Sequence, residues 1–368
     1  MPHLPQHRVH DREARPHPLF VPQVLHEEEG PGARIAQGHG EWIVHGSEHT
    51  LDGVRVALVC PAPPGSRLGN RITALRWRRM LRELGHEAVI VEPGAAPVAD
   101  VLVALHARRS AESVRRAREQ RPDSRIVVAL TGTDLYRDVH ADESAQRSLE
   151  LADRLVVLHD GAAVELPRAL RSKVRVVPQS APAMRRLPPV RRYFEVAVVA
   201  HLRPEKDPLR AAQAARLLGD RTRIRIVHAG SALSSEMREQ ARSEMRSNPR
   251  YLWLGELPTW KARRLIARAR LLCITSQMEG GANVLSEAIA AGTPVLASRI
   301  PAMRAILGGD YQGLFPFGDT RTLASLFRRA EHDRHFVAVL RRRCLAVRPR
   351  LSPAGERAAL RSLLAELA

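Results

Sequence analysis

An apolar run that leads through a glycine pair into a helix-forming segment is the feature that most constrains the fold of this chain. The run Leu271–Ile274 predicts a buried strand, and Gly280 and Gly281 predict a tight turn from that strand into a helix. Such a turn presents free backbone N–H groups that bind phosphate. Glu279 and Glu287 add carboxylates, which accept hydrogen bonds from sugar hydroxyls. The segment therefore predicts a nucleotide-sugar site.

Apolar runs alternate with helical segments along two successive parts of the chain, which indicates two doubly wound parallel sheets. Strands are predicted at residues 54–60, 89–91, 101–105, 126–130, 155–158 and 174–177, and again at 196–200, 224–227, 251–254, 271–274 and 295–297. Helices are predicted at residues 70–85, 111–120, 144–151, 208–218, 261–269 and 322–331, after the glycine pair, and over the last 30 residues. The fold class is therefore α/β, with two Rossmann-like domains facing a cleft and ligands beyond the carboxyl ends of the strands.

The predicted domain limits follow from this pattern. Residues 51–185 form an acceptor domain, residues 186–345 form a nucleotide-sugar domain, and residues 346–368 form a C-terminal helix. The Arg- and Pro-rich segment 182–192 is typical of a linker. Residues 1–50 hold half of the 16 histidines and no lasting period of 2 or 3.6, so we expect a mostly disordered extension.

The composition favours small-molecule substrates over nucleic acid. The net charge is +19, but only three of the 58 basic residues are lysines, and the arginines are spread along the chain. Aromatic residues make up 4%, which is few for base-stacking surfaces. We therefore expect a solvated basic surface that attracts small anions rather than a nucleic-acid partner.

The sequence also predicts a cytoplasmic protein without stable membrane insertion. No apolar run approaches 18 residues, and no signal-peptide pattern opens the chain. Cys60, Cys273 and Cys344 are far apart and lack CxxC spacing, so we expect neither a disulfide framework nor a zinc site.

Two cations follow the first strand of the second domain. Arg203 and Lys206 are three residues apart on a turn that enters a helix, so both can face one diphosphate. A lysine is unusual in this arginine-rich chain and suggests that a compact ammonium is needed. The alternative is a surface pair that stabilises the turn.

These two motifs together resemble the retaining glycosyltransferases of the GT-B type, family 4 in particular. The resemblance continues through Gly255-Glu256-Leu257, residues 290–295 and Phe317-Gly318-Asp319. It implies that Glu287 holds the nucleotide ribose and that Glu279 contacts the donor sugar. Arg203 and Lys206 would bind the diphosphate. The remaining nucleotide-sugar positions that we expect are Gly230, Gly280, Gly281, Asn283 and Val284. The alternative for Glu287 is an exposed helical glutamate.

The first domain resembles the selenosugar synthases of selenoneine biosynthesis. The segments that carry this resemblance are residues 69–77, which open a helix, and residues 130–136 at a strand end, where Thr131 stands in place of a common histidine. The resemblance implies that selenophosphate attacks a UDP-sugar, UDP-GlcNAc or UDP-glucose, to give a 1-seleno sugar. It also implies hand-over of the product to the next enzyme of that pathway. We expect no cofactor and no metal, because Arg203, Lys206 and the helix N-terminus supply the positive charge and no Asp-x-Asp pair stands near the site.

The residue chemistry of the first domain is compatible with a small anionic acceptor. Asn70 and Arg71 at a helix N-terminus, with Arg67 before it, offer donors and charge, and Thr131 and Thr133 offer hydroxyls. The predicted catalytic residues are Glu279, Asn70, Arg71, Thr131 and Asp134. Alternatives remain: Asn70 as a plain helix cap, Asp134 as a turn residue, and His106 and His159 as histidines without a catalytic role.

Two other functions are compatible with the sequence. One is sugar transfer to a cell-envelope glycan or lipid, which predicts an apolar or amphipathic patch on the first domain. The other is nucleic-acid binding through the +19 charge, which predicts a steep salt dependence.

Overall fold

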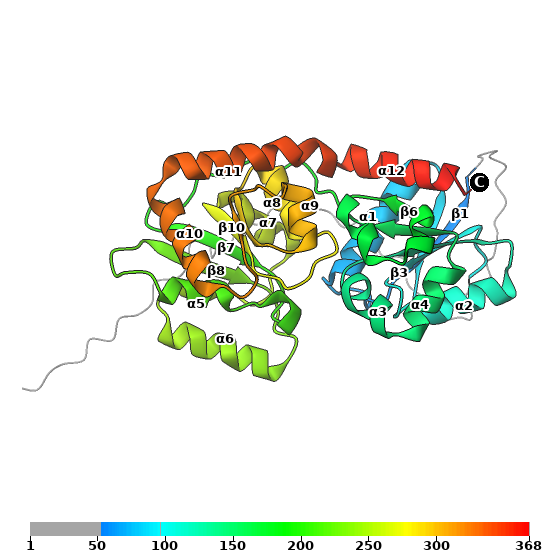
Figure 1. Cartoon of the computed structure of the whole chain (residues 1–368), viewed down its shortest axis with the longest axis horizontal. Helices are drawn as coiled ribbons and strands as arrows, with labels where there is room; N and C mark the ends of the chain where they lie inside the picture. The colour runs from blue at the N-terminus through cyan, green and yellow to red at the C-terminus, as the bar shows by residue number, and fades with distance from the viewer. Residues whose placement is uncertain (1–52, 96, 368) are drawn as a thin grey trace, which may run out of the picture. The chain divides into compact units, whose positions relative to one another are not determined.

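The computed structural model describes residues 53–95 and 97–367. The extension predicted for residues 1–50 lies outside this range. The described chain holds two six-stranded sheets in which every strand pairs in parallel with its neighbours (Figure 1). This confirms the α/β fold class with two doubly wound sheets.

The first sheet has the strand order β2-β1-β3-β4-β5-β6. Its strands are β1 (Arg55–Val59), β2 (Glu87–Val91), β3 (Val101–Leu105), β4 (Arg125–Ala129), β5 (Arg154–Val157) and β6 (Val174–Val176). Its helices are α1 (Gly69–Glu83), α2 (Ala111–Gln120), α3 (Val139–Ala141) and α4 (Glu143–Leu151), with a π-helix at Asp134–Asp138 and 3-10 turns at Asp160–Glu165 and Arg168–Lys173. Apolar side chains pack on both faces of this sheet.

The second sheet has the strand order β12-β11-β10-β7-β8-β9. Its strands are β7 (Phe194–Val199), β8 (Ile224–Ala229), β9 (Tyr251–Trp253), β10 (Leu271–Ile274), β11 (Val295–Ser298) and β12 (Leu314–Phe315). The helices that follow are α5 (Arg210–Arg216), α6 (Ser235–Ser247), α7 (Thr259–Arg268), α8 (Asn283–Ala291), α9 (Pro301–Leu307), α10 (Thr320–His332) and α11 (Arg334–Val347). A 3-10 turn, Pro204–Lys206, follows β7.

The strand orders locate one switch point in each sheet. Chain order reverses between β1 and β3 in the first sheet and between β7 and β10 in the second. Loops that leave neighbouring strands at a switch point diverge to opposite faces, which opens a crevice that ligands use in doubly wound folds. The predicted cations follow β7 and the glycine pair follows β10, so the sequence motifs meet at the second switch point.

The C-terminal helix α12 (Pro353–Ala365) packs on the first sheet, although it follows the second sheet in the sequence. Leu360, Leu363 and Leu364 belong to the same apolar cluster as Trp77 of α1. A turn at Arg348–Leu351 joins α11 to this helix. The chain therefore returns to its first half after completing the second.

Three elements differ from the sequence prediction. α6 was not predicted because Ala241 is its only buried residue in a polar segment, so no apolar period marks it. α9 and β12 were also missed, since seven and two residues are too short to show a period. The predicted cap at Asn70 is wrong: α1 begins at Gly69, its N-cap is Leu68, and no side chain caps it.

Candidate functional site

A salt bridge joins the two predicted motifs at the second switch point. Lys206 Nζ lies 2.6 Å from Glu279 Oε1, and Ser276 Oγ donates to the same oxygen at 2.6 Å. Thr275 Oγ1 donates to the carbonyls of Lys206 and Asp207, each at 2.9 Å, and so ties the two loops together. Lys206 is thus held in place by the carboxylate expected to contact the sugar. A bound diphosphate would meet an ammonium that is already oriented.

Arg203 offers an unpaired positive charge beside this salt bridge. It is half-buried at the start of the 3-10 turn, and within residues 53–95 and 97–367 its guanidinium has no hydrogen-bond or ion-pair partner. A partly buried cation without a carboxylate is costly unless a ligand supplies the counter-charge. Arg203 is therefore the cation at this edge best placed to accept an anion.

The glycine pair is required by close approach of the first half of the chain. A Cβ on Gly280 would lie 2.3 Å from the Thr131 carbonyl oxygen, and one on Gly281 would lie 2.8 Å from Gln179 Oε1. The residue in the left-handed region is Ala282, with φ of 53°, rather than either glycine. The prediction that the glycines form the tight turn is thus wrong in detail, because Ala282 makes it. A non-glycine residue in this region carries strain of about 1–3 kcal/mol, a cost often found at functional sites.

The N-termini of α1 and α8 come together. A Cβ on Gly69, the first residue of α1, would lie 3.9 Å from Asn283 Nδ2 on the first residue of α8. Among the described residues, the N–H groups of Gly69, Asn70, Asn283 and Val284 make no backbone hydrogen bond. Each helix N-terminus carries partial positive charge, so their meeting forms an anion-binding position.

Arg76 connects this position to the C-terminal helix. Its Nη1 donates to Asn283 Oδ1 at 3.0 Å, and its Nε lies 2.9 Å from Glu356 Oε2. Glu356 is fully buried and also accepts hydrogen bonds from Trp77 Nε1, at 2.7 Å, and from the backbone N–H and hydroxyl of Ser180. Sequence reasoning missed Glu356, because a lone glutamate in a C-terminal helix gives no sign of burial.

The second predicted carboxylate, Glu287, pairs with Arg263 rather than facing solvent. Arg263 Nε donates to Glu287 Oε1 at 2.9 Å. Burial raises the pKa of the Glu287 carboxyl, and the hydrogen bond from Arg263 only partly offsets this effect. Gly230 has a packing role, since a Cβ there would lie 1.8 Å from the Ala200 carbonyl oxygen at the end of β7. Any ligand contact by Gly230 would therefore use its backbone.

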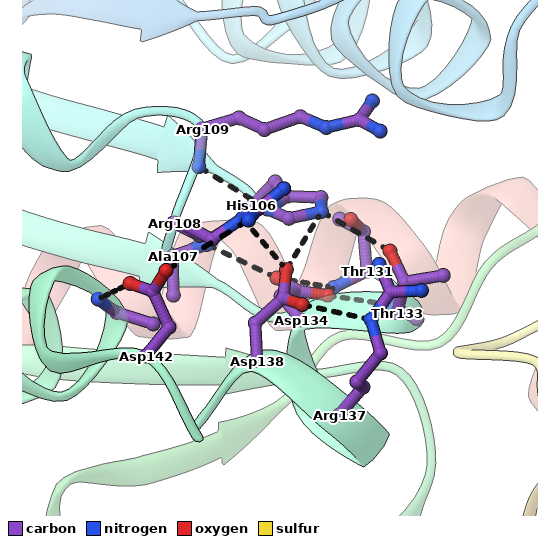
Figure 2. Close-up of polar contacts among 12 residues, drawn as sticks. His106, Ala107, Arg108, Arg109, Thr131, Thr133, Asp134, Arg137, Asp138 and Asp142 are labelled. Carbon is purple, nitrogen blue, oxygen red and sulfur yellow. Dashed lines mark hydrogen bonds and ion pairs between the residues drawn. The ribbon is translucent and has the colours of Figure 1, made fainter. Parts of the chain in front are cut away.

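The Asp134 carboxylate accepts hydrogen bonds from backbone N–H groups at the edge of the first sheet. Its carboxylate is fully buried and accepts from the N–H groups of Ala107, Thr131 and Gly132 at 2.8–3.2 Å (Figure 2). This arrangement fits the turn-forming alternative and leaves little capacity for proton transfer. It also fixes Thr131 and Gly132 against Gly280 of the other half.

Arg71 and Thr131 remain available for a ligand. Arg71 is the third residue of α1, and its Nε is buried without a hydrogen-bond partner among the described residues. Thr131 is half-buried, and its hydroxyl makes no hydrogen bond in the described chain. Asn70 likewise makes no side-chain hydrogen bond within the described ranges.

Two buried histidines at strand ends of the first sheet hold hydroxyl groups. His106 Nε2 lies 3.1 Å from Thr133 Oγ1, and His159 Nε2 lies 2.9 Å from the Tyr136 hydroxyl. Burial lowers the pKa of His159 to about 4 and also lowers the pKa of His106. Burial raises the pKa of the Tyr136 phenol, and the Glu279 carboxylate adds to that rise. Both histidines are therefore neutral near pH 7.

A cavity of about 310 Å³ lies behind His159. Its other lining residues include Leu158, Val176, Ile306 and Leu351. Of the residues that the sequence predicted for the site, none lines this cavity. The predicted residues instead gather where the carboxyl edges of the two sheets meet.

No helix in the described part of the chain has both the length and the apolar character needed to cross a bilayer. Residues 183–344 match the family described as Glycosyl transferases group 1. No curated protein matches the sequence.

Solved structures share the fold across most of the chain. HepE of Anabaena in complex with UDP and glucose has 14% identity and a TM-score of 0.67, and the match covers 85% of this chain and 100% of that one. Sucrose-phosphate synthase of Thermosynechococcus elongatus has 14% identity and a TM-score of 0.69, with 85% and 98% covered. The lipopolysaccharide outer core galactosyltransferase WaaB has 13% identity and a TM-score of 0.62, with 85% and 99% covered. The chain therefore has the GT-B fold of these structures, and its residues 183–344 match the model of the Glycosyl transferases group 1 family.

Proposed function

We propose that this glycosyltransferase takes a hexose from a UDP-sugar, UDP-glucose or UDP-GlcNAc, and transfers it to selenophosphate to give a 1-seleno sugar. The observation that carries the proposal is the meeting of the α1 and α8 N-termini near the motif that holds Arg203 and Lys206. Helix N-termini and cations together favour a diphosphate. The similarity to HepE, whose structure contains UDP and glucose, supports UDP as the nucleotide.

The donor half of the reaction uses charge and positioning. Arg203 and Lys206 offset the negative charge that grows on the departing diphosphate, and Lys206 is already oriented by Glu279. Glu279 then contacts the sugar, and Glu287 the ribose. In this proposal the hydrogen bond from Arg263 directs the Glu287 carboxyl and counters part of the rise in its pKa that burial causes.

The acceptor half is supported by how the polar groups of the first sheet are used. Asp134 is occupied by backbone N–H groups, and His106 and His159 are neutral and hydrogen-bonded. An alcohol must lose a proton as it attacks, whereas selenophosphate is ionised near neutral pH and needs little help from a base. The selenium–carbon bond forms at the anomeric carbon as the carbon–oxygen bond to UDP breaks, and UDP leaves with the electron pair. The first product is thus a sugar selenophosphate, and later attack of water on its phosphorus breaks the selenium–phosphorus bond, releases phosphate and leaves the 1-seleno sugar.

The test is a set of incubations with UDP-glucose and UDP-GlcNAc, each with and without selenophosphate. We expect a seleno-hexose by mass spectrometry and a matching rise in UDP release. Thiophosphate should be a poorer acceptor, and phosphate should be nearly inert. If the rate of UDP release does not change with selenophosphate but rises with a glycan or lipid acceptor, the proposed function is wrong. Envelope-glycan synthesis, the function that the similarity to WaaB favours, would then replace it.

A further inference from the structure

His106 occupies a strained position at the switch point of the first sheet. It directly follows β3, is 3% exposed, and has φ of 78°. A residue with a side chain rarely adopts this left-handed conformation, because its Cβ comes too close to the following carbonyl oxygen. Backbone strain of this kind persists where the surrounding structure enforces it, and often at sites of function.

The hydrogen bonds of His106 determine which ring nitrogen carries the proton. The backbone N–H of Arg109 donates to His106 Nδ1 at 3.3 Å, so Nδ1 acts as an acceptor (Figure 2). Burial lowers the pKa of His106, and the ring is neutral near pH 7. A neutral imidazole has one N–H, so the proton must lie on Nε2.

The Nε2–H group has two acceptors nearby, and distance selects between them. Thr133 Oγ1 lies at 3.1 Å, within hydrogen-bond range, whereas Asp138 Oδ2 lies at 3.8 Å. Asp138 is held by guanidinium groups instead, with Arg137 Nε at 3.0 Å and Arg108 Nε at 3.3 Å. His106 therefore donates to Thr133.

This donation sets the role of the Thr133 hydroxyl. One lone pair of Oγ1 accepts from His106, and the hydroxyl proton remains free to donate, since Thr133 makes no other side-chain hydrogen bond among the described residues. Thr133 is half-buried and follows Gly132, whose added Cβ would lie 3.4 Å from Gly280 N of the donor-site loop. The free O–H thus belongs to the segment that meets the donor site.

We propose that His106 is a positioning residue that orients the Thr133 hydroxyl as a hydrogen-bond donor to the attacking acceptor. The identity of that acceptor as an oxyanion, selenophosphate, rests on the function proposed above. The arrangement of His106 and Thr133 does not, because it follows from the contacts of these two side chains.

The test compares Thr133→Val, which removes the hydroxyl but keeps the shape, with Thr133→Ser, which keeps the hydroxyl. A hydrogen bond to a charged group contributes about 1.5–3 kcal/mol, so T133V should raise the KM for selenophosphate by roughly 10-fold or more. T133S should restore most of that loss. His106→Asn, chosen because Asn tolerates the left-handed conformation, should raise the same KM in the same direction. The KM for the UDP-sugar should stay within about twofold, a smaller change than one lost hydrogen bond produces.

Equal acceptor KM values in wild-type and T133V proteins would overturn the inference. So would equal losses in T133V and T133S, because packing rather than the hydroxyl would then explain them. If the wild-type enzyme does not use selenophosphate, the proposed function fails, and the same variants are assayed with whichever acceptor supports turnover. A KM for that acceptor that rises in T133V and in H106N but not in T133S supports the role of His106 and Thr133, and an unchanged KM in T133V refutes it.

Discussion

The carboxyl edges of the two sheets use different chemistry. The edge of the second sheet carries charged groups: Lys206 pairs with Glu279, and Arg203 has no ion-pair partner among residues 53–95 and 97–367. The edge of the first sheet carries neutral histidines that hold hydroxyls, His106 with Thr133 and His159 with Tyr136. A nucleoside diphosphate is permanently charged and is held by fixed cations, whereas an attacking group needs orientation. The difference is consistent with the proposed function, in which the second half binds the donor and the first half positions the acceptor.

Glu356 is the residue whose removal should have the largest effect, because it holds α12 to α1 and fixes Arg76, which in turn contacts Asn283 of the second half. Glu356→Ala leaves Arg76, Trp77 Nε1 and the Ser180 N–H buried without an acceptor, and breaking a buried pair in this way costs about 3–5 kcal/mol. Glu366→Ala is a matched control near the end of the same helix, where the ion pairs to Arg154 and Arg175 are partly exposed, and it should cost about 0–1 kcal/mol. Urea unfolding measures both. Similar losses in the two variants would show that the buried contacts of Glu356 with α1 and Ser180 do not stabilise the fold as described.

Removing the cations at the edge of the second sheet tests the proposed donor site. Arg203→Ala or Lys206→Ala should each lose about 2–4 kcal/mol of transition-state stabilisation, because in the proposed site each removes a charged contact to the departing diphosphate. Lys261→Ala is the control, since the Lys261 ammonium lies over the Trp260 ring, 5.3 Å from its centroid, and is not part of the proposed site. The measurement is kcat/KM for UDP release. Near-wild-type values for both site variants would remove the diphosphate assignment.

The sequence predicted the second edge better than the first for a physical reason. Arg203 and Lys206 lie on one turn, and Glu279 and Glu287 frame one strand–helix junction, so each chemical unit is local in sequence. His106 and Thr133 are 27 positions apart, and Arg76 and Glu356 are 280 apart, so only the folded chain brings them together. The same reasoning recovered most strands and helices, whose apolar periods are local, but missed the polar helix α6.

Sequence reasoning also misassigned local backbone roles. The glycines at 280 and 281 signalled a turn, yet their small size is needed because Thr131 and Gln179 approach from the first half, and Ala282 makes the turn. Asp134 has the residue type of a catalytic acid, but three backbone N–H groups occupy it. In both cases a distant segment decides the role of the residue.

Gly280→Ala should strain the contact between the two regions. The new Cβ would lie 2.3 Å from the Thr131 carbonyl oxygen, so one loop must move, and overpacking of this kind costs about 1–3 kcal/mol. Gly219→Ala is the matched control, because a Cβ there meets nothing within 4 Å. Thermal unfolding of both variants, with and without UDP-glucose, gives the measurement. If G280A is as stable as G219A, the halves do not approach as closely as the contact at Thr131 requires.

A smaller effect concerns pH and one buried histidine from each region, His159 in the first and His228 in the second. Burial lowers the pKa of each to about 4, against an ordinary value of 6.5. The unfolded chain therefore binds protons at a higher pH than the folded protein. The stability that these neutral histidines contribute is complete above about pH 6.5 and is lost as the pH falls toward 4. Between pH 7 and pH 5.5, the loss for each histidine should be about 1 kcal/mol of unfolding free energy.

His228 donates from Nε2 to the Ala200 carbonyl and accepts from Tyr251 at Nδ1, whereas Nδ1 of His159 has no partner among the described residues. His159→Gln and His228→Gln should each flatten the decline measured by urea unfolding at several pH values. A decline that persists unchanged in H159Q but flattens in H228Q would mean that His159 is protonated without unfolding. His159 would then not be a buried neutral histidine, and the contrast drawn between the two sheet edges would fail for that residue.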